Sequence, residues 1–246
     1  MAKSPALSSL NTSPEVTDSG VDAAVIPLGS VEGKGPHLPV GTDLILADAF
    51  AGSCADEVGS VYVLPALPFG CSGSQHGFLG TVYWEPDTMW DALVDMVGSL
   101  HHGGFRRFTV LNLCSTNWVV KPTVRELNLR MGLGRTVWVE PKQFAYDRFR
   151  EIDSSGDDRH GGAVETALMM HCLPASVGPP PADHVPSVGW EFVDYVGLRA
   201  VSETGVWGRP SQATAALGGE LYEHMLTCTV TYVEAAFATW DAEGVR

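Results

Sequence analysis

Residues 21–59 read VDAAVIPLGSVEGKGPHLPVGTDLILADAFAGSCADEVG, and this stretch contains the pattern most informative about the fold. Its first eight residues are mostly apolar and include valine and isoleucine, which predicts a buried strand. Residues 43–59 carry apolar side chains at helical spacing, begin at Asp43 as a candidate N-cap and end at Gly59, which predicts a helix. The stretch is therefore a strand and a helix joined by a loop rich in polar side chains.

The same alternation of strand and helix continues along the chain. Further strands are predicted at residues 60–70, 106–113 and 135–140, and helices at 85–104, 121–132, 163–173 and 219–240. This order indicates an α/β fold with a mostly parallel sheet covered by helices on both faces. Ligands of such sheets bind beyond the carboxyl ends of the strands, so the loops that follow the strands are where a site is expected. These loops are residues 29–42, 68–84, 112–120 and 140–162.

Composition narrows the class of protein. The chain has 246 residues, 45% of them hydrophobic, and a net charge of −14, which argues against binding to nucleic acid or to anionic membranes. It lacks an apolar run long enough for a membrane span. Residues 1–20, rich in serine, threonine and proline, are predicted to be a disordered leader before a single α/β domain at 21–246. Five cysteines without a CxxC pair indicate a reducing, cytoplasmic setting.

The first post-strand loop brings together Glu32, Lys34 and, at its end, Asp43. Carboxylates in a glycine- and proline-rich loop are typical of a metal site, yet a protonated lysine has no lone pair with which to bind a metal. Asp43 alone could also be an ordinary helix cap, a role worth about 1 kcal/mol.

Two other loops carry reactive side chains. The strand at 106–113 runs into a group of small polar residues that includes Cys114, Thr116 and Asn117. In RHGGAVETALMM, His160 precedes Glu165 by five residues, and this histidine is a candidate general base or ligand. His76, Tyr83, Trp84 and Trp118 lie in or beside the expected loops. Together with Thr116 and Asn117 they are predicted to bind substrate, although core packing is the commoner role of tryptophan.

Five segments in order resemble the creatininase (creatinine amidohydrolase) family. PLGSVEGKGPHLPVGTD at 27–43 is similar to the family signature PxGSxEQHGPHLPLxTD. The other four segments are HGFLGTVYW, RRFTVLNLCSTNW, RHGGAVETALMM and GVWGRPSQATAALGGELY. The resemblance implies a three-layer α/β/α fold, assembly as a homo-oligomer, often a hexamer, and hydrolysis of amide bonds with two adjacent zinc or manganese ions.

The resemblance also assigns roles to single positions. Glu32 and Asp43 match two metal ligands, and His160 and Glu165 match a catalytic-site histidine and its neighbouring glutamate. Three ligand positions are altered and hold Lys34, Cys114 and Thr116. Because an ammonium can balance the charge of carboxylates, we interpret Lys34 as an organic replacement for one metal ion.

Three interpretations follow. In the first, Glu32, Lys34, Asp43, Cys114, His160 and Glu165 form a metal-free catalytic site of an enzyme in secondary metabolism. That enzyme would cyclise, condense or isomerise a small carbonyl- or amide-containing metabolite, without a cofactor. In the second, Glu32, Asp43 and Cys114 hold one zinc or manganese ion and the enzyme cleaves a C–N bond. In the third, the protein binds a ligand or partner without catalysis.

Overall fold

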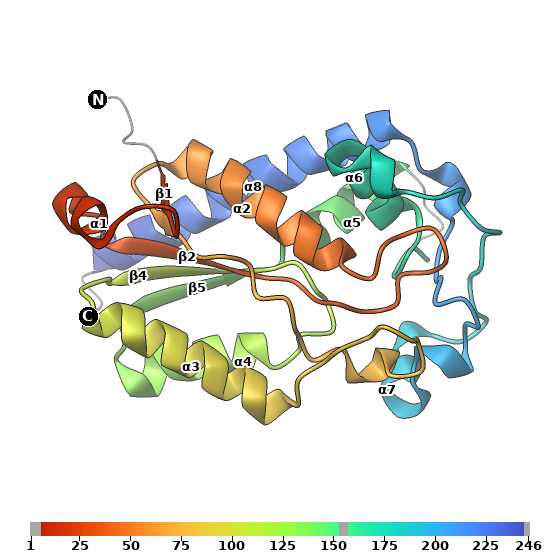
Figure 1. The fold of residues 1–246 in the computed structure, drawn as a ribbon, viewed down its shortest axis with the longest axis horizontal. Helices are drawn as coiled ribbons and strands as arrows, with labels where there is room; N and C mark the ends of the chain where they lie inside the picture. The colour runs from red at the N-terminus through yellow and green to blue at the C-terminus, as the bar shows by residue number, and fades with distance from the viewer. Residues whose placement is uncertain (1–5, 153–156, 244–246) are drawn as a thin grey trace.

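The computed structural model describes residues 6–152 and 157–243 and has a five-stranded parallel sheet at its centre (Figure 1). The strand order is β1-β3-β2-β4-β5, and every neighbouring pair is parallel. The sheet is therefore parallel throughout its described strands. The strands are β1 (Leu7–Ser8), β2 (Ala23–Leu28), β3 (Tyr62–Val63), β4 (Arg107–Asn112) and β5 (Arg135–Val139).

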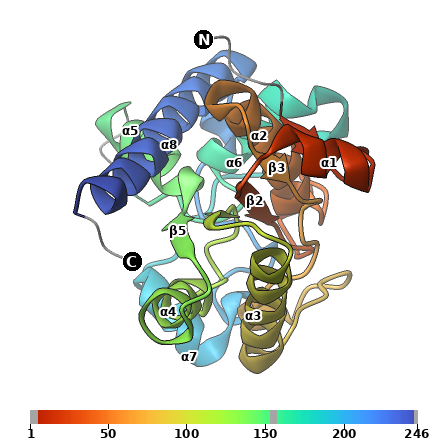
Figure 2. The same ribbon diagram turned by 90° about the vertical axis from the view of Figure 1, so that its left-hand side faces the viewer.

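Helices cover both faces of this sheet, which confirms the predicted three-layer α/β/α architecture (Figure 2). One face is covered by α2 (Thr42–Val58), α5 (Pro141–Ile152), α6 (Ala163–Cys172) and α8 (Ala215–Glu243). The other is covered by α3 (Pro86–His102) and α4 (Val120–Glu126), which continues into a π-helical turn at Leu127–Met131.

Strand β2 shows why both faces must be covered. Val25 packs into the core on the α2–α8 side, whereas Ala24, Ile26 and Leu28 pack into the core on the α3 side. Successive side chains of a strand point to opposite faces, so a strand that is apolar at every position needs a layer on each side. The first predicted strand thus behaves as its composition indicates.

Shorter elements complete the described chain. The helix α1 (Ser13–Ser19) lies near the amino terminus, and α7 (Val193–Val196) lies near the end of the sheet where the site is found (Figure 1). Single turns are formed by Ser72–Gln75, Pro174–Ser176, Trp190–Phe192, Leu198–Ala200 and Pro210–Gln212. None of the described helices combines the length and apolar composition needed to cross a bilayer.

Three local predictions were wrong. Leu7–Ser19 is not a disordered leader, because it contributes β1 and α1; residues 1–5 lie outside the described residues. A capping box stabilises α1: the Thr12 side chain accepts from the Glu15 backbone, and the Glu15 carboxylate accepts in return.

The strand predicted at 60–70 is reduced to Tyr62–Val63 by its prolines, which cannot donate to a ladder. Residues 141–152, predicted to be loop, form α5.

Candidate active site

The loop that follows β2 places two buried charged side chains at the carboxyl end of the sheet. Glu32 and Lys34 are 0% and 2% exposed. Gly161 makes this possible, because it lies against the Lys34 backbone with a positive φ of 57° and any Cβ there would be 2.7 Å from the Lys34 carbonyl oxygen. The glycine pair before α6 thus lets the loop and α6 approach each other.

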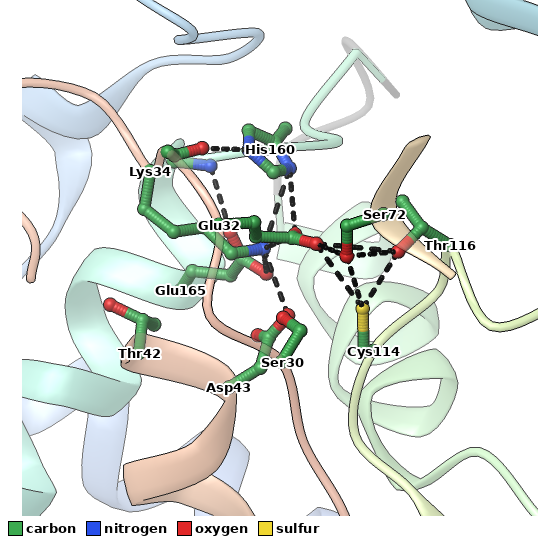
Figure 3. A network of polar contacts seen from close by, with 12 residues as sticks. Ser30, Glu32, Lys34, Thr42, Asp43, Ser72, Cys114, Thr116, His160 and Glu165 are labelled. Carbon is green, nitrogen blue, oxygen red and sulfur yellow. Dashed lines mark hydrogen bonds and ion pairs between the residues drawn. The ribbon is translucent and has the colours of Figure 1, made fainter. Parts of the chain in front are cut away.

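The Lys34 ammonium lies among three carboxylates (Figure 3). Its Nζ is 2.8 Å from Glu32 Oε1 and 3.1 Å from Asp43 Oδ2. The third contact, at 3.0 Å, is Oε1 of Glu165 on α6. Asp43 is the second residue of α2, which has no side-chain cap, and its Oδ2 accepts from Ser30 Oγ. Its role is therefore in the site rather than as a cap.

A second buried ammonium, which the sequence analysis missed, comes from α5. Lys142 is 1% exposed, and its Nζ lies 2.7 Å from Asp43 Oδ1 and 2.5 Å from Glu165 Oε1. It lies in the post-strand segment 140–162 that was expected to hold site residues, so its position was the one signal that could have revealed it. We call Glu32, Lys34, Asp43, Lys142 and Glu165 the ammonium–carboxylate cluster.

The second oxygen of Glu32 faces a group of hydroxyls and a thiol. Ser72 Oγ donates to Glu32 Oε2 in a very short hydrogen bond, and Thr116 Oγ1 lies 3.3 Å from the same oxygen. Cys114 Sγ is 3.5 Å from it and 2.9 Å from Thr116 Oγ1. Ser72, in the turn at Ser72–Gln75, was not predicted as a site residue. It lies in the loop 68–84, where site residues were expected.

His160 is held as a neutral imidazole. Its Nε2 lies 2.7 Å from the Gly33 carbonyl oxygen, which can only accept, so Nε2 carries the hydrogen. Its Nδ1 lies 3.4 Å from Lys34 Nζ and accepts from it. Burial, together with the Lys34 ammonium, lowers the pKa of His160. Both ring nitrogens of His160 therefore have hydrogen-bond partners within the site.

The ammonium groups keep the glutamates ionised. Burial alone would raise the pKa of Glu32, but Lys34, His160 and the hydrogen bond from Ser72 together outweigh it and lower that pKa to about 2. For Glu165, Lys142 and Lys34 likewise overcome burial and hold the pKa well below its ordinary value. The carboxylates in turn overcome burial and raise the pKa values of both lysines. With all five side chains charged, three carboxylates face two ammonium groups.

The donor set does not fit a pair of divalent ions. A bridging carboxylate must offer one oxygen to each ion, but Lys142 contacts one oxygen of Asp43 and Lys34 contacts the other. One group of donors, from Glu32, Asp43 and Cys114, lies within 4.8 Å and could surround a single ion. That ion would share carboxylates with Lys34 and require loss of the Cys114 proton, while burial raises the pKa of this thiol well above its ordinary value.

A pocket of about 770 Å³, which we call the aromatic pocket, lies beside the cluster. Thr116 connects the two, because it lines the pocket and also contacts Glu32. Of the predicted substrate-binding residues, the pocket is lined by His76, Tyr83, Trp84, Thr116 and Trp118.

Asn117 is the exception among the residues predicted to bind substrate. It is 2% exposed, its Oδ1 accepts from the Cys71 backbone and its Nδ2 donates to Asn112 Oδ1. Both ends of the amide thus hold the loop after β4 in place, and Asn117 does not line the pocket.

The chain is similar to known proteins in both sequence and fold. The family model described as "Creatininase: Creatinine amidohydrolase" matches residues 9–233. The mycofactocin precursor peptide peptidase of Mycobacterium tuberculosis is 31% identical over 215 residues, which cover 82% of this chain and 80% of that protein. The creatinine amidohydrolase of Pseudomonas putida is 25% identical over 167 residues, covering 61% and 64%. A solved structure named "Creatininase Mn" has a TM-score of 0.79 at 21% identity and covers 94% of this chain and 99% of that one.

Proposed function

Because the chain belongs to the creatininase family, we propose that it is an enzyme that hydrolyses an amide bond, with Lys34 and Lys142 taking the place of divalent cations. The relatives named peptidase and amidohydrolase support the bond type. The observation that carries the finer proposal is the Lys34 ammonium within 3.1 Å of three carboxylates, at a position where the family signature has a histidine.

Thr116 is the residue of the proposed mechanism that contacts both Glu32 and the substrate pocket. Lys34 holds Glu32 ionised and in place, and the other Glu32 oxygen accepts from the Thr116 hydroxyl. In the proposed reaction, Thr116 Oγ1 attacks the carbonyl carbon of the amide while its proton passes to Glu32. The C–N bond breaks as that proton is passed to the leaving amine, and water cleaves the ester left on Thr116. Hydrolysis then adds water across the C–N bond and yields an acid and an amine.

Metal analysis combined with an activity screen tests this proposal. The purified protein is assayed on small amides and short peptides before and after treatment with a strong chelator, and its metal content is measured by mass spectrometry. We expect hydrolysis to survive chelation and the metal content to stay far below one ion per chain. Thr116→Val should abolish hydrolysis, whereas Ser115→Ala, beside it in the pocket lining, should retain most of it.

A one-metal amidohydrolase is the second candidate, favoured by the closeness of Glu32, Asp43 and Cys114. A single zinc with an open position can activate water. This candidate predicts about one zinc per chain, lost in Cys114→Ser together with activity. That result would overturn the lysine proposal, which predicts instead that Cys114→Ser retains activity.

The other predictions from the sequence stay predictions with their own readouts. Cyclisation or isomerisation would leave the product mass without an added water, and condensation would join two reactants. A non-catalytic protein would keep its cellular role in Glu32→Gln and His160→Ala variants. Light scattering of the purified protein tests the homo-oligomer, and the neighbouring genes test the assignment to secondary metabolism.

A further inference from the structure

The walls of the aromatic pocket come from three separate segments. Tyr83 and Trp84 follow the turn at Ser72–Gln75, Trp118 follows β4, and Trp190 and Tyr195 come from the segment that contains α7. Trp190 also stacks on His160, with ring centroids 6.4 Å apart, so this wall lies directly against the site. The faces of aromatic rings carry partial negative charge and attract cations.

The charged side chains that line the pocket are negative, like the faces of its aromatic rings. Glu85 and Asp194 line it and are both exposed, while its described lining contains neither lysine nor arginine. The one histidine of the lining, His76, is tied through Nδ1 to the Gly73 carbonyl oxygen at 2.9 Å. The described lining therefore has two carboxylates and five tyrosine and tryptophan side chains, and no lysine or arginine opposes them.

This negative pocket stands in contrast to the cluster next to it, where every carboxylate touches at least one ammonium group. A positive charge that would complete the pocket has to come from the ligand. The volume of about 770 Å³ is within the range of roughly 300–1,000 Å³ typical of small-molecule sites.

We propose that the aromatic pocket binds an alkylammonium or guanidinium group of the substrate and so presents a nearby amide to Thr116. The proposal rests on the function proposed above, because it takes the ligand of the pocket to be an amide. It assigns the substrate class as cationic amides: molecules with a positive group a few bonds from the scissile C–N bond.

Calorimetric titration with three matched compounds tests the charge preference. N-acetyl-argininamide is cationic, N-acetyl-leucinamide is neutral and N-acetyl-isoglutamine is anionic, and all three share the acetylated amide frame. We expect the cationic compound to bind about tenfold tighter than the neutral one and the anionic compound to bind most weakly. Equal affinities, or a preference for the anionic compound, would overturn the proposal.

Paired variants locate the preference in the pocket. Glu85→Gln with Asp194→Asn should reduce the advantage of the cationic compound to about threefold, and Trp118→Ala should weaken its binding to a similar extent. Asp18→Asn with Asp56→Asn removes the same charge at exposed positions outside the pocket lining and should leave the advantage intact. If this remote pair reduces it equally, the preference belongs to the overall charge and the proposal is wrong.

The binding experiment and the hydrolysis assay fail independently. Cationic compounds that bind tightly but are never cleaved would support the pocket and contradict the proposed hydrolysis. Hydrolysis of amides without any charge preference would contradict the pocket proposal alone.

Discussion

The ammonium–carboxylate cluster and the aromatic pocket meet at Thr116 but treat charge in opposite ways. In the cluster every charged side chain is at most 2% exposed and touches a partner of opposite sign. In the pocket, Trp118 is 64% exposed and the carboxylates have no lysine or arginine in the described lining. The difference shows that the cluster fixes local structure and charge, whereas the pocket is available to recognise something outside the protein.

Removing the central ammonium should have the largest effect on stability. Lys34→Met leaves three carboxylates around an apolar side chain, and breaking a buried pair in this way costs about 3–5 kcal/mol of unfolding free energy. Urea denaturation measures the loss. Lys121→Met, at an exposed lysine over the Trp138 ring, is the matched control and should cost less than about 1 kcal/mol. Equal losses in the two variants would show that the cluster is not compact as described.

Lys142→Met should have a smaller effect, because this ammonium contacts two carboxylates rather than three. We expect a loss of about 2–4 kcal/mol in the same urea experiment. The double variant should not show the sum of the two losses, since both lysines share Asp43 and Glu165. Strict additivity would contradict a single network.

Acid should weaken the protein in a defined pH window. The folded-state pKa of Glu32, about 2, lies below its ordinary value of 4.5, so its contribution is present above 4.5 and is lost as the pH falls toward 2. Glu165, whose pKa is also lowered, acts in the same direction. Asp158, whose pKa burial raises to about 7, acts oppositely, mainly between pH 4 and 7.

Glu32→Gln isolates this contribution, because glutamine does not titrate. The gap in unfolding free energy between wild type and Glu32→Gln should be constant from pH 7 to about 5 and narrow below pH 4.5. Urea denaturation at each pH measures the gap. A gap that stays constant down to pH 3 would show that the pKa of Glu32 is not lowered in the folded protein.

The pocket should tolerate truncation with the smallest effect on stability. Trp118→Ala should change the unfolding free energy by no more than about 0.5 kcal/mol, because the side chain is mostly exposed. Trp207→Ala, at a tryptophan that is 3% exposed, is the matched control and should cost about 3–5 kcal/mol. If Trp118→Ala proves as costly, its ring is part of the core and the contrast between the two regions is weaker than described.

The sequence predicted most of the fold because its strands are rich in apolar and β-branched residues and because glycines and prolines mark the ends of several helices. The failures have local causes. The capping residues Thr12 and Glu15 lie in a serine- and proline-rich stretch whose composition masked α1. The polar helix α5, PKQFAYDRFREI, was obscured because it directly follows β5 with only Glu140 between.

The helix α5 and the site residue Lys142 were missed for the same reason, because Lys142 lies on α5. The resemblance singled out Glu32, Lys34 and Asp43, and the structure brings Cys114, His160 and Glu165 close to them. Lys142 matches none of the family motifs used and lies in a segment predicted to be irregular. Ser72 likewise has no motif around it. Contacts of this kind depend on how distant segments pack, which periodicity and spacing do not encode.

The two ammonium groups of this site are covalently part of the chain. Lys34 and Lys142 are put in place when the protein is synthesised, so their charge cannot be exchanged for that of another element. An inorganic ion must be acquired, can be replaced by a competitor of higher affinity, and depends on supply. The charge that these ammonium groups provide is therefore immune to metal starvation and to mismetallation.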